Sequence, residues 1–217
     1  MMDELTIIQR IAVWVLPVVF AITVHEVAHG WVAKKYGDNT ASSLGRLTLN
    51  PIKHIDLFGT IILPGLLLVT GTGFIFGWAK PVPVDPRNFK NPLKDMAIVA
   101  LAGPVSNLLM AVFWALITRL GVLIGAGAES VSLPLIYSGV AGISINLVLA
   151  LINLLPIPPL DGSSLVERFL PDGWLQHWYK YRQYGFLVLF GLVFWFDIFT
   201  PILRPFQEAL FRYIFLS

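Results

Sequence analysis

Apolar segments long enough to cross a bilayer alternate with short charged connections along the chain. The first covers about residues 5–36, and two more cover residues 96–120 and 135–156. A shorter apolar segment follows at residues 185–200. A helix of about 20 apolar residues spans the hydrocarbon core of a membrane. The pattern therefore predicts an all-α polytopic membrane protein, a bundle of about four to six transmembrane segments.

The stretch between the first two spans departs from this pattern. Residues 57–78 are apolar, but Pro and Gly interrupt them repeatedly, and the prolines of residues 80–86 are too dense for a helix. The run at residues 44–49 alternates between apolar and polar positions, as a short strand does. We therefore expect a short β element here, followed by a hairpin that re-enters the membrane or lies on its surface.

Composition strengthens the membrane assignment. The chain is 56% hydrophobic and only 13% charged, whereas soluble domains are about a quarter charged. Its 217 residues predict a single domain, with a core at about residues 5–165 and a C-terminal helix or helices at about 166–217. A net charge of +2 gives no reason to expect nucleic acid as a partner, and the absence of cysteine excludes thiolate metal ligands.

The sequence His25-Glu26-Val27-Ala28-His29 matches the H-E-x-x-H zinc motif, near the end of the first apolar segment. Residues four apart share a helix face, so both imidazoles can reach one metal ion, and the neighbouring carboxylate can take a proton from water. Soluble helices carry this pattern by chance. Ionisable side chains are costly at membrane depth, however, and persist there mainly where they coordinate, pair or line a cavity. This setting favours a metal site.

A hydrolytic zinc site needs a third protein ligand and keeps the fourth position for water. Asp161 lies at the end of a predicted span, after the Pro-interrupted residues 153–160. Irregular backbone at membrane depth is tolerated where it is buried in protein or lines a cavity, so this carboxylate is suited to face the metal. Alternatively, Asp161 caps a following helix at residues 162–169. The residues alone leave both interpretations open.

Three segments, in this order, resemble the signature motifs of the site-2 protease family of intramembrane zinc metalloproteases. They are HEVAH at residues 25–29, AGPVSN at 102–107 and NLLPIPPLDG at 153–162. Two further segments, NPIKHID at 50–56 and GWAKPVPV at 77–84, resemble the small subgroup of that family without PDZ or CBS domains.

This resemblance implies one zinc ion per chain, held by His25, His29 and Asp161, with Glu26 as general base and acid. It further implies that peptide bonds of single-span or membrane-embedded protein substrates are hydrolysed within or near the lipid bilayer, in regulated intramembrane proteolysis. A metal-binding transporter or channel without proteolytic activity is the alternative, since histidines and an aspartate can also line an ion pathway. The oligomeric state stays open.

Three further residues are candidates for the site. By similarity to the family, Asn153 could hold the substrate strand or stabilise the oxyanion, or it could satisfy carbonyl groups of a broken helix. Asn107 is better suited to hydrogen bonding within the core than to catalysis. His54 has the chemistry of a fourth ligand or of a group that orients one, yet it lies in a polar connection beside Lys53.

Basic residues predict the orientation. Lys34, Lys35, Arg46 and Lys53 follow the first span, while its N-terminal side carries Asp3, Glu4 and only one basic residue, Arg10. Because positive residues favour the cytoplasmic side, we expect an integral protein of a prokaryotic plasma membrane with its active site towards the cytoplasm. Asp161 can then reach the two histidines only if residues 57–94 cross the membrane an even number of times, so this stretch is not one simple span.

Overall fold

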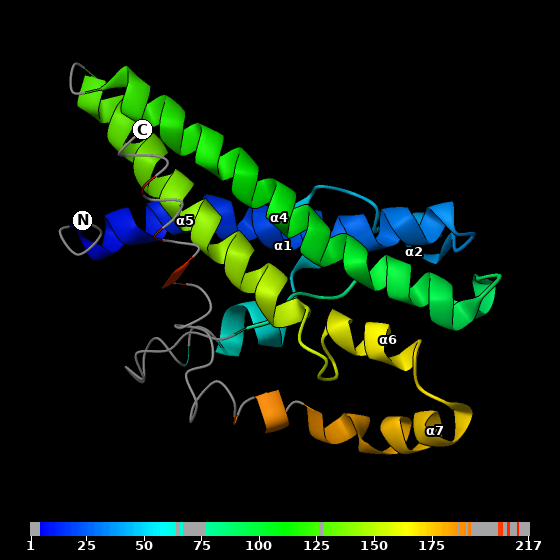
Figure 1. The fold of residues 1–217 in the computed structure, drawn as a ribbon. Coiled ribbons are helices and arrows are strands. Elements are labelled where there is room, and N and C mark those ends of the chain that lie inside the picture. The colour runs from blue at the N-terminus through cyan, green and yellow to red at the C-terminus, as the bar shows by residue number, and fades with distance from the viewer. Residues whose placement is uncertain are drawn as a thin grey trace.

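Three long helices dominate the computed structural model, which describes residues 5–63, 66, 77–125, 128–185, 187–189, 191, 204, 205, 208 and 212. They are α1 (Ile7–Lys35), α4 (Pro92–Ile124) and α5 (Glu129–Asn153) (Figure 1). All three are long and apolar enough to cross a membrane, which confirms three predicted spans. Most of the fourth, at residues 185–200, lies outside the described residues.

The helices α4 and α5 form an antiparallel hairpin that crosses α1 (Figure 1). Trp114 of α4 and Ile143 of α5 are buried between the two helices of this hairpin. In contrast, Leu109, Leu116 and Leu123 are 67%, 65% and 70% exposed. These three leucines are seven residues apart, so they share one face of α4. An apolar outer face of this kind suits contact with lipid.

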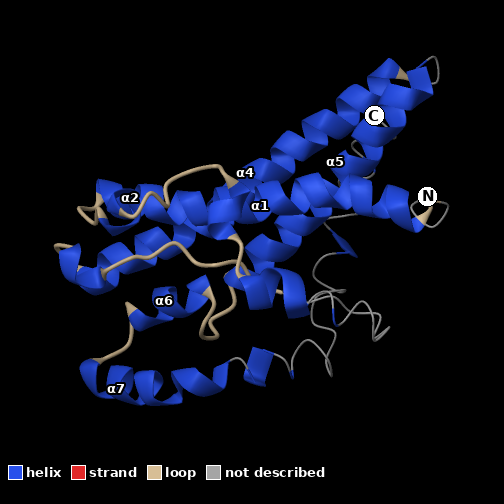
Figure 2. Cartoon of the chain, turned by 180° about the vertical axis from the view of Figure 1, so that it is seen from behind, coloured by secondary structure: helices blue, strands red, loops and turns tan. Residues whose placement is uncertain are grey.

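In its described residues, the connection from α1 to α4 contains short helical turns: α2 (Thr40–Ser43), η2 (Pro51–His54), the π-helical turn η3 (Leu57–Ile62) and η4 (Pro86–Asn88). The predicted strand at residues 44–49 is wrong, and Figure 2 shows no strand in the described part of the chain. Gly45 instead adopts a positive φ of 63°, and Arg46 N donates to Ala41 O over 2.9 Å. Residues 44–49 form a turn after α2 instead of a strand, because no described segment offers them a neighbouring strand.

The two ends of the Gly- and Pro-rich stretch meet. Trp78 N donates to Gly59 O over 3.1 Å, and the hydroxyl of Thr60 donates to Trp78 O over 2.8 Å. The chain therefore leaves and returns at one place, which is what an even number of membrane crossings requires. Most of residues 64–76, between these two ends, lie outside the described part of the chain, and with them most of the predicted hairpin.

After α5 the structure describes α6 (Asp161–Glu167), α7 (Asp172–Tyr181) and the short turn η6 (Arg182–Tyr184). Asp161 is the first residue of α6, and the helix has no side-chain cap at its N-terminus. Trp178 Nε1 donates to Glu167 Oε1 over 3.1 Å, which ties α7 to α6. The contacts of α6 with α4 place Asp161 beside the core of the bundle.

Candidate metal centre

The two histidines of the motif are buried on one face of α1, each only 8% exposed. His25 Nδ1 lies 2.6 Å from Asn107 Oδ1, and His29 Nδ1 lies 2.8 Å from the backbone oxygen of Val99. Both partners are acceptors, so we assign the ring proton of each neutral imidazole to Nδ1. Each Nε2 therefore presents a lone pair, as a metal-ligating histidine does.

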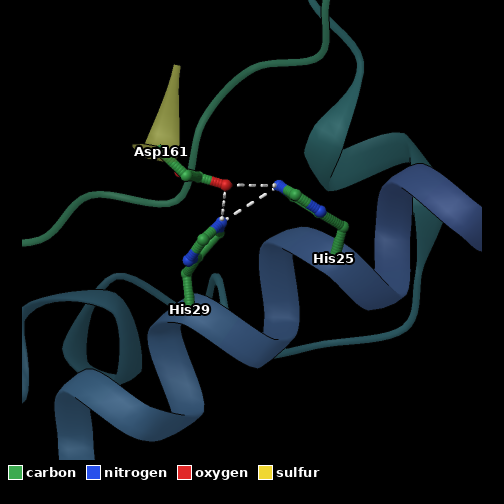
Figure 3. Close-up of side chains that lie close together, drawn as sticks. All are labelled: His25, His29 and Asp161. Carbon is green, nitrogen blue, oxygen red and sulfur yellow. Dashed lines mark hydrogen bonds and ion pairs between the residues drawn. The ribbon is translucent and has the colours of Figure 1, made fainter. Parts of the chain in front are cut away.

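Asp161 brings a carboxylate to the same point from the opposite side (Figure 3). Its Oδ2 lies 3.2 Å from the Nε2 atom of each histidine, and the two Nε2 atoms are 3.0 Å apart. Although Oδ2 is buried, no donor reaches it with hydrogen-bond geometry. With both ring protons assigned to Nδ1, three lone-pair atoms converge at one point, an arrangement that is repulsive unless a cation joins them.

The spacing and the types of donor fit zinc. Ligand atoms that lie about 2.0–2.1 Å from one tetrahedral ion are roughly 3.3 Å from one another, close to the observed separations of 3.0 and 3.2 Å. Two imidazoles and one carboxylate leave a fourth position open, as catalytic zinc sites do. Within the described part of the chain, this is the one group of three or more acidic or histidine side chains close enough to share a metal.

Glu26 is next to the triad but is not one of its three converging side chains. Its Oε2 accepts a hydrogen bond from the backbone N–H of Val82 over 2.7 Å. Its other oxygen, Oε1, has no hydrogen bond among the residues described. The carboxylate is therefore fixed through one oxygen and can exchange a proton through the other.

Two buried amides support His25. Asn107 is fully buried, and its Nδ2 donates to Ala21 O over 3.2 Å and to Asn146 Oδ1 over 2.8 Å. Asn146 is also fully buried and donates to Gly142 O over 2.8 Å. This chain of amides orients Asn107 so that its oxygen faces the imidazole. Asn146 is not among the candidates predicted from the sequence, although an amide inside an apolar span is itself a signal of a buried polar contact.

Gly103 lets α4 approach the histidines closely. A Cβ at this position would overlap both His25 and His29. The backbone of α4 therefore packs directly on the imidazole rings and helps to hold them together. Local sequence could not reveal this contact, because it depends on how two distant helices cross.

The structure does not bring the last two candidates into the triad. Asn153 Nδ2 donates to Leu149 O over 3.0 Å, within its own helix. His54 is 2% exposed, and its Nε2 lies 2.9 Å from Thr48 O. Neither side chain belongs to the group that can hold the metal.

Two histidines of an apolar helix and the carboxylate that begins α6 form a donor set typical of zinc metalloenzymes. The sequence model of Peptidase family M50 matches residues 13–131, more than half of the 217 residues. The chain therefore belongs to this family, the site-2 protease family, and is a zinc metalloprotease.

Several relatives bear names that agree with this family. "Putative zinc metalloprotease YwhC" of Bacillus subtilis is 45% identical over 82% of this chain and 78% of the relative. "Putative zinc metalloprotease Rip2" of Mycolicibacterium smegmatis is 30% identical over 88% of this chain and 74% of the relative. "Putative zinc metalloprotease MJ0611" of Methanocaldococcus jannaschii is 30% identical over 66% and 63%. No solved structure matches the chain.

Proposed function

We propose that this metalloprotease cuts membrane-embedded protein substrates within or near the bilayer, in regulated intramembrane proteolysis. The observation that carries this proposal is the position of the triad. His25 and His29 lie on a helix long and apolar enough to span a membrane, and Asp161 joins them shortly after the last turn of α5. A water-consuming site in this place suits a peptide bond that is itself at membrane depth.

The proposed zinc ligands are His25, His29 and Asp161. When bound there, zinc supplies a water of lowered pKa and polarises the substrate carbonyl. Glu26 acts as general base and then as general acid: its free Oε1 takes the proton of the attacking water and returns it to the leaving amine. The amides of Asn107 and Asn146 hold the ring of His25 in place. Asn153 donates one amide hydrogen to Leu149 O, which leaves its second amide hydrogen and its Oδ1 for a substrate strand.

The substrate class can be tested with purified protein and single-span substrates that share one soluble flank. A helical peptide bond is shielded by its hydrogen bonds, so the substrate must unwind before it is cut. Gly costs about 1 kcal/mol and Pro about 3 kcal/mol in a helix interior relative to Ala. We therefore expect spans that contain Gly or Pro to be cleaved faster than the same spans with Leu at those positions. Cleavage rates are measured by gel electrophoresis, with all substrates in the same detergent. Equal rates would show that unwinding does not select the substrate.

We further propose that the active site faces the cytoplasm, because basic residues follow α1 and positive residues favour that side of the membrane. Single cysteines at Lys35, Lys90 and Asp172 of this cysteine-free chain should then be labelled by an impermeant reagent from the cytoplasmic side only. Inside-out and right-side-out vesicles provide the comparison. Labelling of position 90 from outside alone would contradict the even number of crossings between α1 and α4.

A further inference from the structure

One extended segment, residues 80–85, passes beside the proposed general base. Pro81 and Pro83 restrict this segment to an extended backbone. Between them, the N–H of Val82 donates to Glu26 Oε2 over 2.7 Å. The orientation of the Glu26 carboxylate therefore depends on the orientation of one peptide group, the one that joins Pro81 to Val82.

Arg46 holds the other end of that same peptide group. Its Nη2 donates to the carbonyl of Pro81 over 3.2 Å and to the carbonyl of Lys80 over 2.9 Å. The Pro81 carbonyl and the Val82 N–H belong to one planar unit, so fixing the oxygen also fixes the direction of the N–H. A charged donor on the carbonyl further polarises the group and strengthens the N–H as a donor.

The ends of the segment are anchored as well. Lys80 N donates to His54 O over 2.9 Å, and Asp85 N donates to Asp38 Oδ2 over 2.8 Å. Burial raises the pKa of Asp38, but donors from Thr40, Asp85 and Asn88 outweigh burial and lower the pKa below its usual value. Asp38 thus remains an ionised acceptor at neutral pH. With both ends held by other residues, the central peptide group is the part that Arg46 orients.

We propose that Arg46 is a positioning residue for hydrolysis: through the Pro81–Val82 peptide group it holds the Glu26 carboxylate in its working orientation. The inference rests on the proposed role of Glu26 as general base. It gives the connection between α1 and α4 a part in the chemistry, although no side chain of that connection belongs to the metal triad.

The first test replaces the guanidinium. Arg46→Met keeps the apolar stem and removes every donor, so kcat for a single-span substrate should fall by about tenfold to a hundredfold, the cost of misplacing a general base. KM and the zinc content should stay at their wild-type values, because Arg46 is outside the triad and in this proposal acts only through Glu26. Arg46→Lys should recover part of kcat, since an ammonium can still donate to one of the two carbonyls.

The second test removes the N–H without touching Arg46. Val82→Pro should lower kcat by a similar factor, because proline has no N–H to donate to Glu26. Val84→Pro is the matched control: it makes the same change in the same segment, at an N–H that makes no hydrogen bond among the residues described. Arg46→Met combined with Val82→Pro should cost little more than either change alone, because both act through one contact.

The outcomes separate this inference from the proposed function. If Glu26→Gln is inactive while Arg46→Met and Val82→Pro keep wild-type kcat, Glu26 stands as the base and the positioning role of Arg46 is wrong. If Glu26→Gln is itself active, the proposed role of Glu26 as general base is wrong, and the positioning role of Arg46 is wrong with it. If Arg46→Met also loses zinc or thermal stability, and this loss accounts for its lower kcat, then Arg46 has a structural role. That outcome would also overturn the inference. If Val82→Pro does not fold, the kcat and zinc content of folded Arg46→Met protein decide between these outcomes.

Discussion

Glu26→Gln should leave zinc bound and reduce peptide hydrolysis by about 10²- to 10⁴-fold, the range that general acid–base catalysis contributes. The amide is nearly the same size as the carboxylate and can still accept the hydrogen bond of Val82 N–H, but it cannot take a proton from water. Zinc should remain because the three converging ligand atoms come from other residues. Metal analysis and cleavage of a single-span substrate, on the same preparation, measure the two effects.

Glu129→Gln is a suitable control for that experiment. It makes the same chemical change at the exposed first turn of α5 and should leave both the zinc content and the rate unchanged. A Glu26→Gln protein that cleaves at the wild-type rate would remove Glu26 from the mechanism. One that loses its zinc would show instead that this carboxylate takes part in metal binding.

Replacing any one of the three proposed ligands by Ala should release zinc. His25→Ala and His29→Ala each remove one of two imidazoles, and Asp161→Ala removes the carboxylate that faces both of them. Groups that merely orient a ligand are worth about 10- to 100-fold in metal affinity, so the loss of a ligand itself should exceed this range. Equilibrium dialysis against a zinc buffer gives the affinities.

His54→Ala provides the control for the ligand series, because it removes a histidine that is also buried but lies outside the triad. Its zinc affinity should equal that of the wild type. Full zinc occupancy in Asp161→Ala would contradict the ligand assignment, while loss of zinc in His54→Ala would make His54 part of the centre.

Hydropathy and helical periodicity predicted the parts of this protein that depend on local sequence. Long apolar runs gave α1, α4 and α5, and the spacing of His25 and His29 placed both rings on one helix face. Asp161 is different, because its neighbours in sequence say nothing about which helix it meets. Its place beside the histidines was expected from the family resemblance, and residue patterns alone left helix capping as a competing interpretation.

The misses share one physical cause, which is contact between distant segments. The alternation at residues 44–49 is compatible with a strand, but a strand needs a partner and no described segment supplies one. Gly103 and Asn146 gain their importance from where α4 and α5 cross α1. The hydrogen bond from Val82 to Glu26 likewise joins a loop to a helix through a backbone atom, whose donor is the same for any residue except proline.

The order of the three triad residues along the chain delays the completion of the proposed metal centre during synthesis. During synthesis, α1 with its two histidines emerges before the α4–α5 hairpin and well before Asp161. A ribosome-bound chain with only α1 inserted therefore has an incomplete triad. The proposed metal centre is complete only once α6 lies against α4, after the surrounding helices have been made.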